Sequence, residues 1–516
     1  MTSIHSTIAE IEEHNKHVIK PPVLNSRNIS KYFSTRFSSL FVPSEELQQY
    51  SKSEIFNPFR SLHELNRRQW AFFCVGFLGW TWDAFDFFAV SLNVSNIAED
   101  LNKSVKEVTW GITLVLMLRS VGAVLFGVLS DRFGRKYTYI SNLVILTILQ
   151  IGCGFVKTYK QFLGVRALFG IGMGGLFGLA AATALDDCPK AARGAISGLF
   201  QEGYAFGYLL VVCFQRAIVH NSPYGWRSLF WFSAGPPVLF VLWRLWLPET
   251  DGYIQQQQRL KLEEQFRAEQ DLPPKKFFEF SDSAKKAMKT YWLMFSYSVI
   301  LMAGFNFMSH GSQDLYPTLL TVQLNFGEDR STVTNSVANL GAILGGFLVG
   351  HFSTFAGRRL SIMVCCVVGG ALIYPWAFVR NSGINAGAFF LQMAVQGAWG
   401  VIPIHLSELA PPQYRALITG LSYQLGNLAS SASSTIEATI GERFPLGGGH
   451  YDYAKTMSIF MGAVFAFVLV VTFLGPENRG AEFDIDRDEK VEVVNKEDEI
   501  DSLDEAKQYD ERREIV

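Results

Sequence analysis

The segment Gly127–Lys136 reads GVLSDRFGRK, and the segment Gly350–Arg359 reads GHFSTFAGRR. Both begin with glycine, carry a second glycine at the eighth position followed by two basic residues, and lie 223 residues apart. Two further loops recur in the same order: Pro189–Gly194 with Pro411–Ala416, and Leu247–Thr250 with Gly475–Asn478. Three loops repeated at a nearly constant displacement indicate that the chain consists of two similar halves.

The apolar runs between these loops indicate membrane spans. Of the 516 residues 49% are hydrophobic, and they are concentrated between residues 70 and 474. A run of roughly 20 apolar residues crosses the hydrocarbon core of a bilayer. Twelve such runs are predicted, near 70–93, 108–129, 138–156, 162–185, 195–217, 228–247, 293–320, 332–352, 360–379, 386–406, 416–440 and 456–474.

We therefore predict an all-α membrane protein with twelve transmembrane helices in two pseudo-symmetric six-helix bundles. The expected parts are an N-terminal tail (1–66), an N-terminal bundle (67–250), a linker (251–290), a C-terminal bundle (291–479) and an acidic tail (480–516). Most of the N-terminal tail has the composition of a disordered segment. Between Arg27 and Phe41, alternating basic and aromatic residues also suit a short helix on a membrane surface. The acidic tail is a candidate for ubiquitination and recognition by endocytic machinery.

The repeated loops resemble those of the major facilitator superfamily, over about residues 70–480. In that family the loop after the second span is cytoplasmic. The resemblance thus implies that both termini are cytoplasmic, as the basic linker also favours. The family's loop bridges helix ends and biases conformational exchange, which implies a conformational latch formed by Gly127, Asp131, Arg132, Gly134 and Arg135. Because the second copy has Thr354 where the first has Asp131, we expect a charged latch in the first copy only.

Polar side chains crowd the seventh span. They are Asn306, Ser309, His310, Ser312, Gln313, Asp314 and Thr318. Asn306, His310 and Asp314 recur every four residues and therefore wind along one side of a helix. A bilayer core does not solvate such groups, so they must face protein or a water-filled path. The stripe indicates the lining of a transport pathway, and Pro317 predicts a bend at the outer end of the helix.

The same stripe resembles a narrower signature. The pattern Asn-x-x-Ser-His-x-Ser-Gln-Asp-x-x-x-Thr, typical of fungal Jen-type carboxylate–proton symporters of the sialate–proton symporter group, is filled at every specified position from Asn306 to Thr318. The resemblance implies a plasma-membrane secondary transporter of small monocarboxylates (lactate, pyruvate, acetate) or dicarboxylates (succinate, malate) with protons. The residues do not decide between the two substrate classes.

Arg119 lies in the middle of the second span, where a charged side chain costs about 2.5–3.5 kcal/mol on insertion scales and is seldom present without a use. Its planar fork can hold a carboxylate by two hydrogen bonds. The alternative is an internal ion pair with Asp83 or Asp86. The other substrate-binding candidates are Asn306, His310 and Gln313 and, from the resemblance, Gln424 and Asn427 in the eleventh span.

Two pairs of ionisable residues are candidates for proton coupling. His310 and Asp314 can face each other at i and i+4, and imidazole titrates near neutral pH. Asp83 and Asp86 lie about 60° apart on the first span, with structural pairing to a nearby arginine as the alternative. At the displacement of the repeat they correspond to polar residues of the seventh span, so we expect both helices to line one central cavity.

The sequence shows no nucleotide-binding glycine-rich motif, metal-ligand spacing or nucleophile elbow. We therefore expect no enzymatic activity, no metal and no cofactor, with protons as the coupling ion. The expected partners are the carboxylate, protons and membrane lipids, and not nucleic acid. Two other functions stay open: a proton-coupled carrier of another anion, such as phosphate or sialate, and a nutrient receptor that signals without net transport.

Overall fold

The computed structural model describes most of the chain. The described residues are 25–43, 47–48, 50–103, 105–185, 187–189, 192–219, 221–250, 253–254, 257, 289–411, 415–431, 433–441, 443–447 and 450–479. Nearly all of the predicted linker and the whole acidic tail lie outside them, so the proposed recognition by endocytic machinery stays a prediction.

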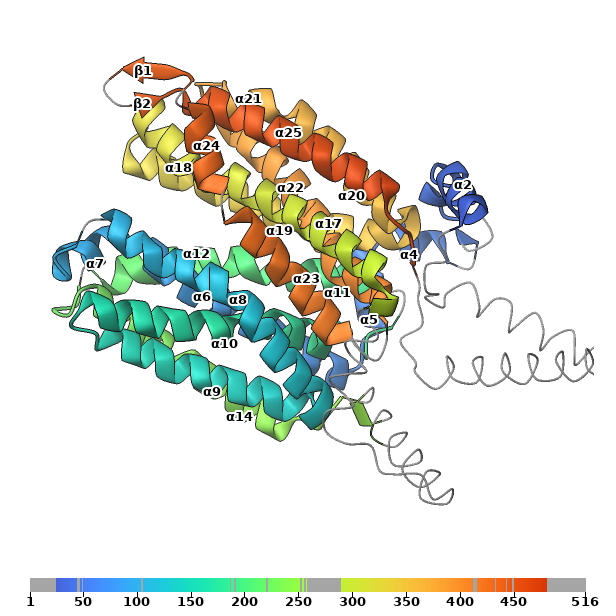
Figure 1. The fold of residues 1–516 in the computed structure, drawn as a ribbon, viewed down its shortest axis with the longest axis horizontal. Helices are drawn as coiled ribbons and strands as arrows, with labels where there is room; N and C mark the ends of the chain where they lie inside the picture. Colours follow the sequence, from blue (N-terminus) through green and yellow to red (C-terminus); the bar gives the residue numbers. More distant parts are fainter. Residues whose placement is uncertain are drawn as a thin grey trace, which may run out of the picture.

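Six membrane-crossing segments form the N-terminal bundle, drawn from blue to green in Figure 1. They are α6 Arg67–Ser91, α8 Val105–Phe133, α9 Arg135–Gly154, α10 Tyr159–Leu185, α11 Arg193–Gln201 with α12 Gly203–Ile218, and α13 Trp226–Ser233 with α14 Gly235–Trp246. A short helix, α7 Val94–Asp100, lies between the first two segments.

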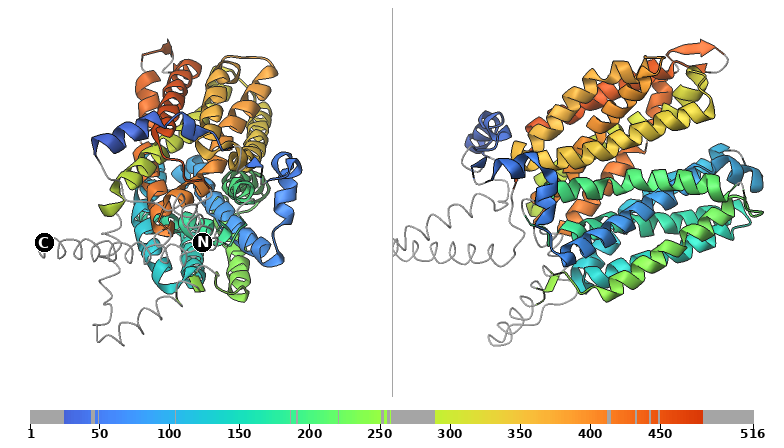
Figure 2. Two further views of the ribbon diagram at one scale, coloured as in Figure 1. Left: turned by 90° about the vertical axis from the view of Figure 1, so that its right-hand side faces the viewer. Right: turned by 180° about the vertical axis from the view of Figure 1, so that it is seen from behind.

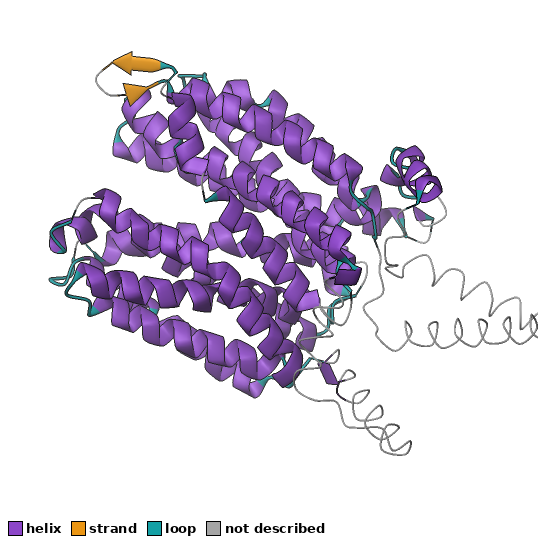
Figure 3. Ribbon diagram, in the orientation of Figure 1, coloured by secondary structure: helices purple, strands orange, loops and turns teal. Residues whose placement is uncertain are grey.

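Six more segments form the C-terminal bundle. They are α17 Trp292–Gln313, α19 Glu328–Ala356, α20 Arg358–Ala371 with α21 Ile373–Ala377, α22 Gly383–Leu409, α23 Arg415–Ser430 with α24 Ser433–Gly441, and α25 Tyr453–Leu474. The hairpin of β1 Pro445–Gly447 and β2 His450–Tyr451 is the only strand structure in the described chain (Figure 3).

The predicted twelve-helix architecture is confirmed. Ten of the described segments are long and apolar enough to cross a membrane, with the fifth taken over 193–218 and the sixth over 226–246. The other two segments are α20 with α21 and α23 with α24, which correspond to the ninth and eleventh predicted spans. The bend expected near Pro317 is also present, because α17 ends at Gln313 and the chain resumes in α18 Tyr316–Thr318 and the π-helical turn η2 Leu319–Gln323.

The two bundles converge at one end. We call this the tail end, defined as the end at which α6 begins and α25 finishes. In Figures 1 and 2 the ribbons of the two halves meet there and diverge toward the opposite end. Glycines allow this approach, since a Cβ atom on Gly198 of α11 would lie 2.1 Å from the carbonyl oxygen of Gly346 on α19. Small residues let helix backbones pack closely within a membrane, so the structure is closed at the tail end.

The described part of the predicted N-terminal tail, residues 25–43, 47–48 and 50–66, forms helices and turns on the tail end, which differs from the expectation of disorder there. Residues 1–24 lie outside the described residues, so that expectation stays a prediction for them. The described part comprises α2 Ser26–Ser34, the 3₁₀ turn η1 Ser38–Leu40, α4 Lys52–Phe56 and α5 Pro58–His63. The Tyr32 hydroxyl donates to the Leu474 carbonyl at 2.7 Å, and Arg36 Nη1 donates to the Gly475 carbonyl at 2.6 Å. Composition did not reveal these contacts because the partners lie more than 400 residues away in the sequence. We call residues 25–66 the strap, since they join the N-terminal bundle and dock on the C-terminal bundle.

The repeated loops make the same backbone contacts in both halves. Gly134 and Gly357 adopt φ angles of +90° and +105°, which glycine reaches without the strain that a side chain would add. The helix that follows each glycine is capped by a distant carboxylate. Glu249 accepts from the Lys136 backbone N–H at 3.0 Å, and Glu477 accepts from the Arg358 backbone N–H at 3.0 Å. A carboxylate at a helix N-terminus is electrostatically favourable, which accounts for the recurrence of the Pro-Glu segments.

The expectation of a charged latch in the first loop copy only is wrong. In the second copy Arg358 forms a two-pronged ion pair with Glu408 of α22, with Nη2–Oε1 and Nε–Oε2 distances of 3.1 Å. Both side chains are at most 2% exposed. Glu408 thus supplies the carboxylate that position 354 lacks. In the first copy Arg132 is exposed and lies over the Phe133 ring at 5.2 Å, and the side chain of Asp131 lies outside the described residues.

Replacing Glu408 by glutamine is expected to destabilise the C-terminal bundle by about 3–5 kcal/mol, because it leaves the buried Arg358 charge without its counter-ion. The midpoint of thermal unfolding of the purified protein would measure this loss. A matched control is Glu107→Gln, which removes a carboxylate from a surface pair with Lys103 that is 37% and 42% exposed. That variant should lose less than about 1 kcal/mol. Equal midpoints for the two variants would contradict a stabilising role for the buried pair.

Candidate substrate-binding site

Arg119 lies buried in the middle of α8, and its guanidinium is not paired with a carboxylate of any described residue. Nη2 donates to the sulfur of Met173 at 2.6 Å, and the guanidinium carbon lies 5.0 Å from the centre of the Phe87 ring. The Nε atom has no hydrogen-bond partner in the described part of the chain. The alternative interpretation, an ion pair with Asp83 or Asp86, is not observed within the described residues at the 4.0 Å limit for such pairs. The guanidinium therefore keeps donors for an anionic ligand.

Gln424 and Asn427 of α23 meet the Arg119 region across the boundary between the bundles. Gln424 Nε2 donates to the Gly174 carbonyl at 3.4 Å, and Asn427 Nδ2 donates to Gln424 Oε1 at 3.1 Å. A Cβ atom on Gly174 would lie 1.9 Å from the Arg119 carbonyl oxygen, so that glycine packs directly on the Arg119 backbone. Three residues that the sequence predicts for substrate binding are thus brought together, two of them from the opposite half.

His310 and Asp314 form the predicted pair on α17. His310 Nδ1 lies 3.1 Å from Asp314 Oδ2, and the side chains are 19% and 37% exposed. Both lie near the end of α17 that is opposite the tail end, where the bundles diverge (Figure 1). The pair belongs to the C-terminal bundle, and among the described residues no hydrogen bond joins it to Arg119.

Asn306 and Gln313 make their hydrogen bonds within the C-terminal bundle. Asn306 Nδ2 donates to the Met302 carbonyl of its own helix at 2.8 Å. Gln313 Nε2 lies 3.3 Å from Gln392 Oε1 on α22. Gln313 thus links α17 to α22, whereas Asn306 bonds within its own helix. Among the described residues neither side chain hydrogen-bonds to Arg119, Gln424 or Asn427. Thr318, the last residue of the signature, has a side chain outside the described residues.

Asp83 and Asp86 are buried inside the N-terminal bundle. Asp86 Oδ1 accepts from Gln150 Nε2 at 3.0 Å, and the same amide nitrogen lies 3.0 Å from the Ser233 hydroxyl. Asp86 thus points toward α9 and α13, which differs from the expectation that it lines a central cavity. The reason is that the 223-residue displacement matches positions in the two halves by their depth along the helix. It does not determine which neighbouring helix a side chain faces. Neither carboxyl oxygen of Asp83 has a hydrogen-bond partner among the described residues.

Sequence reasoning missed an aromatic cluster at the same boundary. Tyr423 of α23 stacks on Phe177 of α10 with ring centres 4.2 Å apart, and Trp80 and Trp399 lie edge-on to it at 6.1 and 5.8 Å. Tyr204 of α12 also belongs to this cluster, with its ring centre 5.7 Å from that of Trp80. The cluster lies beside Gln424 and contains rings from both bundles. The position of Tyr423 directly before Gln424 is the one sequence signal for it, and that signal is weak among 18 tyrosines and 43 phenylalanines.

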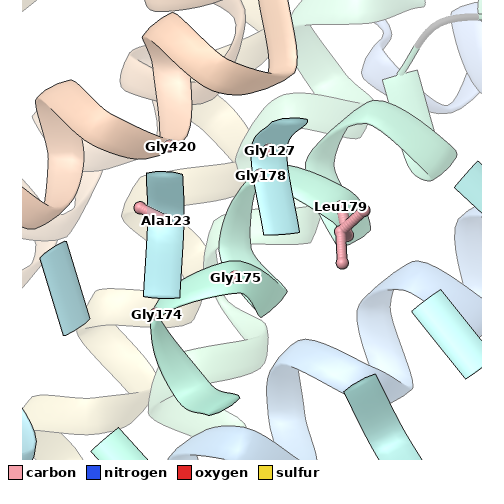
Figure 4. A pocket seen from close by; sticks show the side chains of 7 residues that line it. All are labelled: Ala123, Gly127, Gly174, Gly175, Gly178, Leu179 and Gly420. Atoms are coloured by element: carbon pink, nitrogen blue, oxygen red, sulfur yellow. The ribbon is translucent and has the colours of Figure 1, made fainter. Parts of the chain in front are cut away.

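A small pocket lies where α8, α10 and α23 approach one another (Figure 4). It is lined by Ala123, Gly127, Gly174, Gly175, Gly178, Leu179 and Gly420. None of these seven side chains is polar, so the pocket does not suit a carboxylate. It does place Gly127, predicted as part of the latch, against the other half, because a Cβ atom there would lie 3.0 Å from Leu417 Cδ1.

Comparison with known proteins shows the family. The model of the sugar (and other) transporter family matches residues 68–488. The chain belongs to that family. Its fold is that of the major facilitator superfamily, as a structure of the proton:xylose symporter XylE from E. coli shows, with a TM-score of 0.64 over 83% of this chain and 99% of that one at 18% identity.

Two relatives concern carboxylates. The chain is 42% identical over 467 residues to the carboxylic acid transporter protein homolog of Saccharomyces cerevisiae, covering 88% of this chain and 75% of that protein. It is 25% identical over 408 residues to the cis,cis-muconate transport protein of Acinetobacter baylyi, covering 78% and 93% respectively. The family member described here is thus a multi-pass membrane transporter, not an enzyme, and the resemblance to the Jen-type carriers is confirmed.

Proposed function

We propose that this transporter imports small mono- or dicarboxylates together with protons. The observation that carries the proposal is the buried Arg119 guanidinium, which has no carboxylate partner among the described residues. Gln424 and Asn427 of the other bundle approach it through Gly174, which packs on the Arg119 backbone. Arg119 would hold the substrate carboxylate by two charge-assisted hydrogen bonds. The amides of Gln424 and Asn427 would supply further donors from the other bundle. The two bundles would then close around the anion, with Arg119 contacting it from one bundle and the two amides contacting it from the other.

The charges of the site give a reason for proton coupling. With His310 neutral and Asp314 ionised, the pair carries −1 and opposes the entry of an anion. Once a proton has bound, the pair is neutral overall, and the +1 charge of Arg119 then attracts a monocarboxylate more strongly in a low-dielectric interior. Protonation from an acidic outside would therefore favour substrate binding, and both would be released on the other side.

The proposed location is the plasma membrane, with the tail end facing the cytoplasm. The predicted linker supports this orientation, because it connects the end of α14 with the start of α17, both at the tail end, and its basic residues favour the cytoplasmic side.

Uptake of labelled lactate and succinate tests the proposal. The chain would be expressed in cells that lack their own carboxylate carriers, and uptake would be measured while the external pH is recorded. We expect substrate-dependent alkalinisation outside and faster uptake at acid pH. Transport of phosphate or sialate instead would assign another anion. Surface expression with no uptake of any of them would favour a receptor.

A further inference from the structure

A carboxyl group lies at the break in the fifth span. Glu202 separates α11 from α12 and is 3% exposed. Neither carboxyl oxygen has a hydrogen-bond partner among the described residues. Gly346 on α19 of the other bundle makes room for the group, because a Cβ atom there would lie 1.9 Å from Glu202 Oε1. Glu202 is thus enclosed between the two halves of the protein.

Among the residues that the structure describes, no cation is paired with this carboxyl. The neighbouring Gly203 packs on Trp80 and Thr81 of α6, and Gly346 packs on Gly400 of α22. Neither carboxyl oxygen is hydrogen-bonded to a charged or titratable group of the described residues. The charged groups and histidines on α11 and on the elements packed around it are Arg60 and His63 on α5, Arg67, Arg68, Asp83 and Asp86 on α6, Lys160 and Arg166 on α10, Arg193 on α11, Arg216 on α12, Asp329, Arg330 and His351 on α19, and His405 and Glu408 on α22.

Glu202 also lies next to the contact that closes the tail end. The Ser197 hydroxyl of α11 donates to the Gly400 carbonyl at 2.9 Å and accepts from the Ile404 backbone N–H at 3.1 Å. Gly194 and Gly198 of the same helix pack on Gly350 and Gly346 of α19. In a carrier that alternates its access, opening the tail end must separate α11 from α19. The carboxyl would then pass from an enclosed position to contact with water.

We propose that Glu202 is a proton-binding site and that closure of the tail end takes up a proton there. A buried carboxylate without a partner is strongly disfavoured, so the closed form holds the neutral acid. In the open form water solvates the carboxylate, which then releases its proton at any pH well above about 4.3, the ordinary value for glutamate. This inference extends the transport cycle proposed above, but it is separate from coupling at His310 and Asp314, which lie on the far side of the substrate site.

Proton binding at Glu202 makes closure of the tail end depend on pH in one direction. Closure binds one more proton than opening, so the ratio of closed to open protein falls as pH rises, by up to tenfold per pH unit from this group. Glutamine at position 202 has nearly the same shape and carries no charge. Glu202→Gln should therefore hold the tail end closed and remove that tenfold dependence.

Distance measurements between the bundles test the proposal without substrate. Nitroxide labels would be attached to cysteines replacing Trp246 on α14 and Trp292 on α17, which are exposed at the tail ends of the two bundles. The distribution of distances between the labels would be recorded between about pH 5 and pH 8. This pH range lies above the ordinary pKa of a glutamate side chain. We expect the short-distance fraction of the wild type to fall as pH rises. In Glu202→Gln the logarithm of the closed-to-open ratio should depend less on pH, by up to one unit per pH unit. A slope equal to that of the wild type in Glu202→Gln would overturn the proposal.

Two further variants complete the experiment. Glu107→Gln removes a surface carboxylate from α8 and should keep the slope of the wild type. Gly346→Ala places a methyl group where the Glu202 carboxyl lies, so the open form should be favoured at every pH. Closure of Gly346→Ala to the same extent as the wild type would also overturn the proposal. Because no carboxylate substrate is present, these outcomes do not depend on whether lactate or succinate is transported.

Discussion

Replacing Arg119 by lysine is expected to weaken the apparent affinity for a carboxylate substrate by about tenfold to hundredfold, with normal amounts of protein at the cell surface. Lysine keeps the charge but loses the planar pair of donors that matches a carboxylate. A hydrogen bond to a charged group contributes about 1.5–3 kcal/mol, and each 1.4 kcal/mol is a factor of ten in affinity. The concentration dependence of initial uptake rates would measure the change.

A suitable control for this experiment is Arg216→Lys, because Arg216 lies exposed on α12 of the same bundle. It should transport as the wild type does. Near-normal affinity in Arg119→Lys would remove Arg119 from the substrate site. Its contact with Met173 and its position over the Phe87 ring would then be structural.

Replacing Asp314 by asparagine is expected to abolish acid-driven accumulation while leaving exchange of substrate across the membrane at least partly intact. A carrier transmits a proton gradient only through a group whose proton affinity depends on substrate or on conformation. With one proton carried per monocarboxylate, a difference of one pH unit sustains an accumulation of about tenfold in the wild type. The variant should bring the ratio close to one. Proteoliposomes with an imposed pH gradient provide the measurement.

Asp86→Asn in the same proteoliposomes distinguishes the two candidate pairs. Asp86 is held by Gln150 inside the N-terminal bundle, whereas Asp314 is partly exposed where the bundles diverge. We therefore expect Asp86→Asn to keep its accumulation ratio. If accumulation is lost in Asp86→Asn and kept in Asp314→Asn, the proton-coupling residue would be Asp86 of the N-terminal bundle instead.

The fold was predictable because its signals are local or periodic. Long apolar runs, a repeated loop and a proline each predict structure from a few adjacent residues. The same holds for the His310–Asp314 pair, whose members are one helical turn apart. The proximity of Arg119 to Gln424 and Asn427 was anticipated only through the resemblance to a known family. No periodicity relates residues that are 300 positions apart.

What the sequence did not reveal depends on partners chosen in three dimensions. Glu408 completes the ion pair of Arg358 from 50 residues away, so a loop that lacked an acidic residue was wrongly expected to lack a latch. The direction of Asp86 depends on Gln150 of a neighbouring helix. The fold of the strap depends on carbonyl groups at the far end of the chain. In each case nothing in the local sequence marks the partner residue, and its interaction becomes visible only when the helices are packed.

The strap also limits how far the carrier can move. It leaves the N-terminal bundle at the start of α6 and is bound to the end of α25 through Tyr32 and Arg36, while Arg359 of α20 donates to Ser39. Any separation of the bundles at this end must either extend this covalent tether or detach it. The strap therefore adds a mechanical load to each turnover. Recombinant forms shortened at the N-terminus, or carrying a bulky fusion there, would differ from the full chain in their resting conformation and speed even though every substrate contact is unchanged.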